Sequence, residues 1–291
     1  MPGENTTGTL TDSLNTMVAQ ARIIREYEGT YRRTCDMVDL SKDTGLSWNE
    51  VSFAQVDAQN IVETTRNENF QNFADTLFTI TPTLVQIAVK VTDRTYRRIA
   101  SVAASKLEQL PGNAMARKKD EDYLSLFSTF GTGASPGTGN PLSFGHIAAA
   151  KNRASSNTTE PTMSEVYTIL HGFQIKDLQD ELVSGIGTTN VPVGMTEETY
   201  RKGFRGDVAG SHVFEDGNIT VNSTPDARGA THAKEAVVCV LGMGIKRETR
   251  RDPSFGGGAD EVFITDEYAF GERSAGNWAY AHLSDATAPT S

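Results

Sequence analysis

The spacing of hydrophobic and polar residues changes several times along the chain, and each change predicts a different element. Residues 46–56, LSWNEVSFAQV, predict a strand, and in residues 83–91 Val85, Ile87 and Val89 alternate with polar or small residues, which predicts a second strand. The two strands frame a polar excursion of about 25 residues, whereas structureless loops in compact domains rarely exceed about 12 to 15 residues. The excursion is therefore either a functional segment that reaches outward or an ordinary surface loop.

A helix is predicted to follow the second strand, because apolar residues recur at spacings of three and four. Thr92 or Asp93 is expected to cap its first turn. Pro111 interrupts the pattern, and a proline inside a helix removes a hydrogen bond and kinks the rod. Beyond it the pattern resumes, so we predict one long bent helix over residues 92–128. Its predicted apolar line consists of Tyr96, Ile99, Ala103, Leu107, Leu110, Ala116, Tyr123 and Phe127.

The rest of the chain divides into a helical and a strand-rich part. Residues 13–34 predict a short helical arm, and residues 131–141, GTGASPGTGNP, predict an irregular loop. A helix at 142–153, a buried strand at 166–170 and a helix at 172–183 predict a small α/β layer. After residue 185 the composition favours β structure. The strands expected there are 210–216, 218–223, 234–243, 244–251, 260–271 and 277–283.

Composition and charge narrow the function classes. A formal net charge of -10 argues against a protein whose main task is to bind nucleic acid, since phosphate binding requires a surplus of Lys and Arg. The two cysteines, Cys35 and Cys239, have no C-x-x-C spacing that would indicate zinc or a disulfide framework. The polar N-terminus does not match a signal peptide, and the longest apolar run, residues 236–245, is about half of a membrane span. We expect a soluble, cytosolic chain with no membrane partner.

The predicted helix carries an unusual run of six charges at its middle, from Arg117 to Asp122. Its acids lie three and four residues from its bases, where opposite charges pair on a helix surface. We therefore favour a solvated or interface face over paired carboxylates for acid–base catalysis. Residues 92–119 also hold seven Lys or Arg against two acids, and this local surplus in an acidic chain calls for a partner or a neighbour.

Motifs for catalysis or cofactor binding are weak. Gly133 to Gly137 matches G-x-S-x-G, but Ser135 follows a helix and precedes Pro136, whereas a nucleophile elbow joins a strand to a helix. A flexible connector is the preferred interpretation, and a serine hydrolase that uses Ser135 is a distant alternative. The five histidines lack the spacing that places two metal ligands on one helix face, and the glycines complete no phosphate-binding motif. We expect no cofactor, no metal and no enzyme activity.

Several stretches resemble, in order, the HK97-fold major capsid proteins of tailed bacteriophages. ITPTLVQIAVKVTD followed by a helix that ends GNAMARKKDEDYLSLF resembles the extended β-hairpin loop and long spine helix of that family. LSFGHIAAAKNR, VYTILHG and FQIKDLQDEL are similar to its peripheral helix, strand and helix. FRGDVAGSHVFEDGNI and DEVFITDEYAFGERSAGNWAYAHLSDA resemble the start of the axial domain and its closing strands. Pro111 departs from the expected straight spine helix.

The resemblance implies an α+β, HK97-like capsid fold with four parts. These are an N-terminal arm at 1–45, an extended hairpin loop at 46–91, a peripheral α/β domain at 92–184 that includes the spine helix 92–128, and a mostly β axial domain with closing strands at 185–291. It implies self-assembly through pentamers and hexamers into an icosahedral phage head that encloses double-stranded DNA. The shell of a cellular nanocompartment of the same fold is the alternative function.

The resemblance also implies partners and contact residues. The partners would be many copies of the chain, a portal, scaffolding or decoration proteins, and packaged DNA that is contacted weakly and without sequence specificity. The protein would assemble in the host cytoplasm and reside in the virion capsid. Inter-subunit contacts are expected at Trp48, Val51, Phe53, Val85, Ile87 and Val89. The charged spine interface or inner face would comprise Arg94, Arg97, Arg98, Arg117, Lys118, Lys119, Asp120, Glu121 and Asp122.

Overall fold

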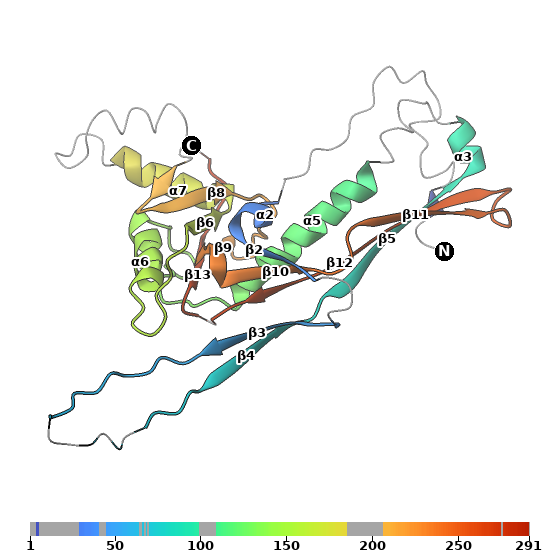
Figure 1. The fold of residues 1–291 in the computed structure, drawn as a ribbon. Helices are drawn as coiled ribbons and strands as arrows, with labels where there is room; N and C mark the ends of the chain where they lie inside the picture. The colour runs from blue at the N-terminus through green and yellow to red at the C-terminus, as the bar shows by residue number, and fades with distance from the viewer. Residues whose placement is uncertain are drawn as a thin grey trace.

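A computed structural model describes residues 4–5, 29–40, 45–63, 66, 68, 70–98, 109–184, 206–274 and 276–290. The architecture is mixed α+β, as predicted, with two sheets, a central helix and a projecting two-stranded arm (Figure 1). The helices are α2 Tyr31–Thr34, α3 Asp93–Arg98, α5 Leu110–Ser125, α6 Phe144–Ser155 and α7 Gly172–Ser184, with 3-10 turns η1 Leu126–Ser128 and η2 Lys234–Ala236. The strands are β1 Glu4–Asn5, β2 Asp36–Asp39, β3 Trp48–Phe53, β4 Asp75–Ile80, β5 Thr83–Thr92, β6 Val166–Leu170, β7 Asp207–Val208, β8 Ser211–Glu215, β9 Asp226–Ala233, β10 Val237–Leu241, β11 Lys246–Asp252, β12 Ala259–Glu272 and β13 Ala279–Asp285.

One sheet has the order β13-β9-β6-β8-β7 and forms the most buried part of the molecule. Every residue of β6 is buried, because this central strand has neighbours on both edges and cover on both faces. Leu142, Ile147, Leu170 and Leu178 join α6, β6 and α7 in one apolar cluster. The predicted helix–strand–helix layer is therefore confirmed, with α6 and α7 each within two residues of the expected bounds at either end.

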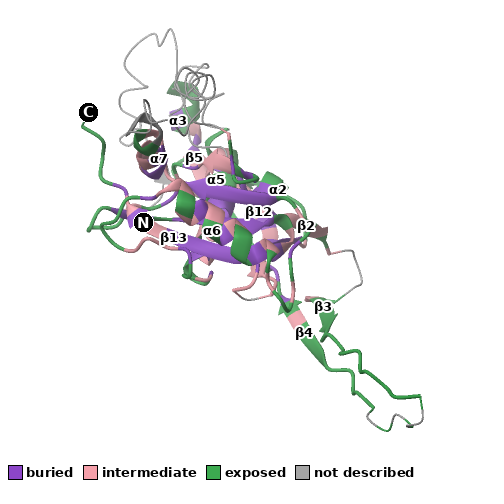
Figure 2. Cartoon of the chain, turned by 90° about the vertical axis from the view of Figure 1, so that its left-hand side faces the viewer, coloured by how far each residue is buried: buried purple, intermediate pink, exposed green. Residues whose placement is uncertain are grey.

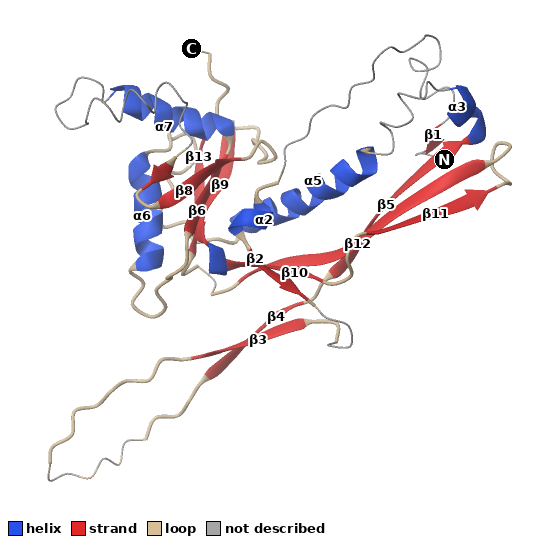
Figure 3. Ribbon diagram, turned by 45° about the horizontal axis from the view of Figure 1, so that its top comes forward, coloured by secondary structure: helices blue, strands red, loops and turns tan. Residues whose placement is uncertain are grey.

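The second sheet has the order β1-β5-β12-β10-β2, and β11 also pairs with β12. Strand β12 joins its two ends, since residues Ala259–Tyr268 pair with β5 and residues Tyr268–Glu272 pair with β10 (Figure 3). Ile87 lies opposite Ile264 in this ladder, so the alternation of β5 places its apolar side chains on one face with those of β12. Helix α5 packs against both strands.

The projecting arm is a hairpin of β3 and β4, which pair from Trp48↔Ile80 to Phe53↔Asp75. It extends away from the body and is exposed over most of its length (Figure 2). The prediction that residues 83–91 form its second strand is wrong. That segment is β5, which follows β4 after the connecting residues 81–82 and pairs with β12, where Ile87 and Val89 lie opposite Ile264 and Val262. Strand β4, which was not predicted, lies within the segment that was expected to be a polar excursion.

The predicted long helix is observed in two described pieces, α3 and α5, and residues 99–108 lie outside the described residues. Thr92 caps α3, since its Oγ1 accepts the backbone N–H of Thr95 at 3.4 Å. Pro111 does not kink a helix interior as expected. It lies in the first turn of α5, where its missing N–H would have no intrahelical acceptor.

The predicted strand at 218–223 is also wrong, and β9 was not predicted. Residues 218–223 are mostly irregular, and their only strand-like pairing is a single bridge between Val221 and Ala227. Strand β9 has the sequence DARGATHA, with one β-branched residue, so propensity gives little signal. Its small residues allow close packing instead: a Cβ at Gly229 would lie 2.6 Å from Cδ2 of Leu170.

The predicted division into four parts stays a prediction, but strand pairing crosses its boundary at 184/185. Strand β6 lies before that boundary and pairs with β8 and β9 after it. Strands β10 and β12, which were assigned to the same part as β8 and β9, belong to the sheet of β5 and β2. The sheets therefore group segments that are distant in the sequence.

Candidate interaction surfaces

The outer part of the β3–β4 arm carries large apolar side chains that are exposed to solvent. Phe53 is 71% exposed, Phe70 is 85% exposed and Phe73 is 81% exposed. The further exposed apolar residues of the arm are Val51, Val56, Ile61, Val62 and Leu77. A monomeric soluble protein rarely presents such a series, and an isolated hairpin is marginally stable at best, so this arm is a candidate binding surface.

The root of the arm is fixed to the body. Ile80 is buried against Val238 and Val240, and its Cδ1 lies so close to Gly271 that a Cβ there would be 2.6 Å away. The Trp48 ring meets Phe78 edge-on at 6.1 Å between centroids. Packing at one end therefore sets the direction of a strand pair whose other end has large exposed side chains.

Arg273 of the segment after β12 adds a polar clamp at the same root. Its Nε donates to Glu50 at 2.8 Å, its Nη1 donates to the carbonyl of Glu235 at 2.8 Å, and its Nη2 pairs with Asp36 at 3.2 Å. The guanidinium carbon also lies 5.8 Å from the centroid of the Trp48 ring. Beyond the paired strands, the side-chain amide of Gln55 donates to the carbonyl of Thr159. These contacts hold the arm in a defined orientation.

The predicted contact residues do not form one surface. Trp48 lies half-buried at the root, whereas Val51 and Phe53 are exposed on β3. Val85, Ile87 and Val89 lie on β5, partly buried, on the face shared with Val262 and Ile264. The structure thus separates the two predicted triplets, and it adds Phe70, Phe73 and Leu77 to the exposed arm. Phe70, Phe73 and Leu77 are visible in the sequence as apolar residues. Because β4 was not predicted, the sequence did not show that they lie on the same arm as Phe53.

The charged run of α5 divides into an exposed and a buried half. Arg117 and Glu121 pair at 3.5 Å, and Lys118 and Asp122 pair at 2.5 Å, both at i,i+4 spacing on the surface. This half fits the predicted solvated face. Surface pairs of this kind contribute about 0 to 1 kcal/mol to stability.

Lys119 and Asp120 are buried, which overturns the expectation that the whole run faces a neighbour or DNA. Lys119 is 5% exposed, and its ammonium pairs by charge with Oδ2 of Asp266 on β12 and lies 5.0 Å from the centroid of the Tyr268 ring. Its position follows from helical spacing, since Met115, Lys119 and Tyr123 lie at intervals of four. Ala116, which was placed on the apolar line, is exposed instead.

Asp120 is 0% exposed and takes part in a polar cluster between three segments. Its Oδ1 accepts the backbone N–H of Thr30 at 3.0 Å, and its Oδ2 accepts the Asn218 amide at 2.9 Å. Asp216, also 0% exposed, accepts the Thr30 hydroxyl at 3.2 Å and the Asn218 backbone N–H at 2.9 Å. Burial, followed by the charge of Asp120, raises the pKa of Asp216 to about 7.

Two histidines, His232 and His282, are also buried in the core. Tyr123 OH lies 2.6 Å from Nε2 of His232, and the other nitrogen of that ring lies 2.9 Å from the carbonyl of Ala233. His282 contacts the hydroxyl of Thr231 at 2.7 Å and the carbonyl of Ala134 at 3.1 Å. Burial lowers the pKa of each histidine to about 4, so both are neutral at pH 7.

The basic residues predicted for the inner face lie at the far end of the second sheet. Helix α3 lies at that end (Figure 1), and its residues Arg94, Arg97 and Arg98 are exposed. Asp93 at the start of that helix binds Arg251 of β11 through two hydrogen bonds of 2.7 and 2.5 Å, which lower the pKa of Asp93. The structure therefore fixes α3 to the strand that forms this edge of the sheet, and it separates these arginines from the charged run of α5.

The remaining motifs have structural explanations. The Ser135 hydroxyl donates to the carbonyl of Leu283 at 3.1 Å and accepts its N–H at 2.9 Å, which fastens the glycine-rich loop to β13. Across the described parts of the chain, no group of three or more His, Cys, Asp and Glu side chains could hold a metal ion. None of the helices described is both long and apolar enough to cross a membrane.

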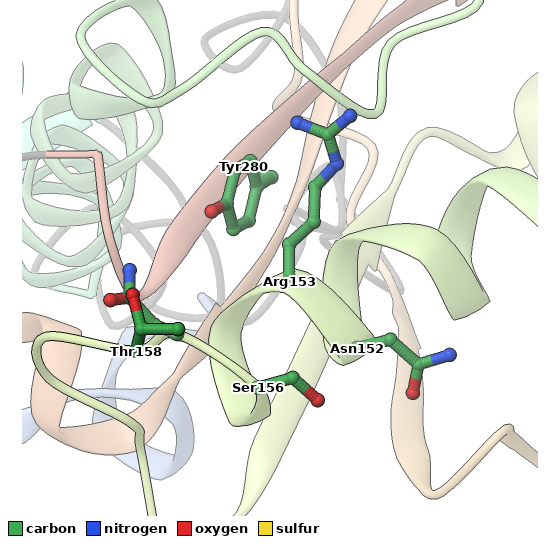
Figure 4. A pocket seen from close by; sticks show the side chains of 6 residues that line it. Asn152, Arg153, Ser156, Thr158 and Tyr280 are labelled. Atoms are coloured by element: carbon green, nitrogen blue, oxygen red, sulfur yellow. The ribbon is translucent and has the colours of Figure 1, made fainter.

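A shallow depression of about 480 Å³ lies at the end of α6. It is lined by Asn152, Arg153, Ser156, Asn157, Thr158 and Tyr280. Figure 4 shows that Asn152 and Arg153 extend from the helix in different directions, so the lining does not converge on one point. This geometry offers no arrangement for nucleophilic or acid–base catalysis at the depression.

Comparison with solved structures identifies the fold, although the sequence is distant from each of them. The chain matches a structure from Mycobacterium phage Che8 with a TM-score of 0.69 and 13% identity over 92% of this chain and 97% of the other. It matches the capsid of Ralstonia phage GP4 with a TM-score of 0.67 and 12% identity over 95% and 98%. A chain of the cyanophage Pam1 capsid matches with a TM-score of 0.71 and 11% identity over 93% and 95%.

No protein-family model matches the sequence, and no curated protein is significantly similar to it. The fold is therefore shared at nearly full length with chains from phage capsids, while sequence identity is at most 13% among the three matches above. The expected HK97-like fold is confirmed at this level.

Proposed function

We propose that this protein is the major capsid protein of a tailed, double-stranded DNA bacteriophage. Its copies assemble through pentamers and hexamers into an icosahedral head, and its role is structural. The observation that carries the proposal is the nearly full-length likeness to chains of phage capsids. An arm with exposed phenylalanines, fixed at its root and exposed at its end, supports it independently, because such a surface is stable only when a partner covers it.

The arm supplies the main contact in this proposal. Phe53, Phe70 and Phe73 pack against a neighbouring copy, together with Val51 and Leu77. Full burial of one such side chain stabilises an interface by about 1.5 to 3 kcal/mol. Trp48 orients the arm from its root. Val85, Ile87 and Val89 pack within the chain, on the face that β5 shares with β12. Portal, scaffolding and decoration proteins are the further partners that a phage head would require.

Contact with packaged DNA is weak and non-specific in this proposal. A chain with a net charge of -10 repels DNA on average, so only a local basic surface can face it. We assign that surface to Arg94, Arg97 and Arg98, which are exposed together on α3. Reversing all three charges is expected to reduce DNA retention in the shell. Unchanged shell yield and unchanged DNA retention would contradict this assignment.

Size and shape of the purified full-length protein test the function. Electron microscopy and size-exclusion chromatography are expected to reveal capsomers or megadalton shells, while a chain that elutes near 31.5 kDa at all concentrations would exclude a coat protein. Replacing Phe70 and Phe73 by serine should reduce assembly while the circular dichroism spectrum is retained. Asn60→Ser in the same exposed arm is the matched control and should assemble normally. Nucleic acid inside native particles indicates a phage head, and an enzyme cargo would indicate a nanocompartment instead.

A further inference from the structure

We propose that Asp120 and Asp216 form a proton-dependent latch, which holds residues 29–34 against α5 while the pair carries a shared proton and weakens when that proton leaves. The latch joins three segments that are far apart in sequence: the residues before α2, the middle of α5 and the turn after β8. It does not depend on the proposed capsid function, because all of its groups lie within one chain.

The geometry brings two acids together in a place without solvent. Both side chains are 0% exposed, and Thr30 and Asn218 each donate to both of them, so the carboxyl groups share the same two partners. Among the described residues, no lysine, arginine or histidine forms an ion pair with either carboxyl group. Two like charges at such a site repel strongly, and one retained proton removes the repulsion and provides a donor between the acids.

The neighbouring titratable groups do not replace that proton. On α5, Lys119 pairs with Asp266 on the other side of the helix, and Tyr123 keeps its proton because burial raises its pKa far above the ordinary value. After α2, burial raises the pKa of the Cys35 thiol in the same way. On β9, His232 reaches this region only through Tyr123 and is neutral at pH 7. The charge state of the two acids therefore decides the electrostatics of the cluster.

The attached segment is positioned by this cluster. A Cβ at Gly29 would lie 2.5 Å from Oδ1 of Asp120, so the backbone of residues 29–30 lies directly on the carboxylate. The chain then continues into α2, where Thr34 contacts Tyr123 OH at 3.0 Å, and into β2, which pairs with β10. Loss of the shared proton thus acts first on the start of this segment.

The direction of the pH dependence follows from linkage. The pKa of Asp216 is raised to about 7 in the closed latch, from an ordinary value of 3.8. A group with a raised pKa stabilises the closed form fully below the ordinary value and loses this effect as pH rises through the raised one. The opening equilibrium should therefore increase by up to about tenfold per pH unit between about pH 4 and 7, and then level off.

Hydrogen exchange of the full-length protein tests the latch. The backbone amides of Arg33 and Cys35 donate to Thr30 and Tyr31, so their exchange, divided by the intrinsic rate at each pH, reports opening of this segment. Measured from pH 5 to 8.5 with a chelator present, the ratio in the wild type should rise about 100-fold up to pH 7, at about tenfold per unit, and then flatten. A ratio that is independent of pH would overturn the proposal.

Four variants separate the latch from general effects of pH. Asp216→Asn should make the ratio independent of pH, and Asp120→Asn serves the same purpose if the first variant does not fold. Glu121→Gln removes a carboxylate from the next, exposed position of α5 and should keep the wild-type profile. Thr30→Val removes a donor that favours the ionised Asp216, so the profile should level off at higher pH. A wild-type slope in both Asp→Asn variants, or a shift to lower pH in Thr30→Val, would refute the latch.

Discussion

The β3–β4 arm and helix α5 distribute polarity in opposite ways. The arm exposes Phe53, Phe70 and Phe73 to solvent, while α5 buries Lys119 and Asp120 in the body. Each arrangement costs free energy unless a partner compensates for it. For α5 the partners are in the same chain, at Asp266, Thr30 and Asn218. For the arm they are not among the described residues, which supports the proposed contact with other copies, whereas the buried charges of α5 have partners within the chain.

The largest expected effect comes from breaking the buried ion pair of α5. Lys119→Met leaves the carboxylate of Asp266 buried without its counter-charge, which should lower the free energy of unfolding by about 3 to 5 kcal/mol in urea denaturation. Replacing Asp266 by leucine in the same protein should recover much of this loss, because two apolar residues need no counter-charge. Lys118→Met, one position earlier and exposed, is the control. Equal losses for Lys118 and Lys119 would contradict the division of the run.

Lowering the pH should reduce the free energy of unfolding, because the two buried histidines, His232 and His282, become protonated on unfolding. Their pKa values of about 4 lie below the ordinary 6.5, so the folded state excludes protons that the unfolded state binds. Their contribution is complete above pH 6.5 and is lost as pH falls toward 4, by about 3 kcal/mol for each histidine. Urea midpoints between pH 7 and 4 measure this loss.

The Asp120–Asp216 pair acts in the opposite sense over the same range, so it must be removed to isolate the histidines. In an Asp216→Asn background, His282→Asn is expected to reduce the fall in stability between pH 7 and 4 by about half. An unchanged fall would show that His282 does not titrate differently in the folded and unfolded states.

Shortening a side chain should have different effects at the buried root of the arm and at its exposed part. Ile80→Ala creates a cavity against Val238 and Val240 and should reduce the unfolding free energy of the unassembled chain by about 2 to 3 kcal/mol. Phe53→Ala removes a larger side chain but should change that quantity by less than about 0.5 kcal/mol, since its site is exposed. Thermal or urea denaturation of the unassembled chain, combined with an assembly assay, distinguishes the two variants. A large stability loss from Phe53→Ala would mean that the arm packs on its own chain.

A small effect is also expected at the exposed half of the charged run. Arg117→Ala removes a surface pair with Glu121 and should change the unfolding free energy by about 0 to 1 kcal/mol, an effect that salt reduces further. Comparison of assembly yields at low and high salt, for the wild type and this variant, shows whether Arg117 contacts a neighbour. Identical yields under all conditions would show that Arg117 does not contact a neighbouring copy.

The sequence predicts those elements whose pattern is strong within one segment. The buried run VYTIL and the flanking amphipathic helices could be located because their apolar residues recur at one period. Strand β9 could not, since Ala, Gly and His carry little strand propensity and its position depends on the fit of Gly229 to Leu170. Strand β5 was located, but its partner was not, because pairing of distant strands leaves no local pattern.

The charged run shows a different limit. Lys119 lies four residues from both Met115 and Tyr123, so helical geometry alone placed it on the buried face. A charged residue at such a position is rare, and the interpretation of the run as a surface followed the usual behaviour of charges. The sequence did not show that Asp266 lies beside Lys119, or Asp216 beside Asp120, because the members of each pair are about 100 to 150 residues apart along the chain. A charge on an apolar line is thus a signal for a distant counter-charge or hydrogen-bond donor.

Strand β12 has a mechanical consequence. Its 14 residues extend over about 45 Å, and ten of them are paired with β5. A force along the strand axis acts on all the hydrogen bonds of this ladder at once, so they must break together. A sideways pull at the free end of the β3–β4 arm would instead open its six register pairs one after another. In the proposed shell, a force along β12 would therefore be shared by ten residue pairs, whereas a force on the free end of the arm would separate its strands one pair at a time.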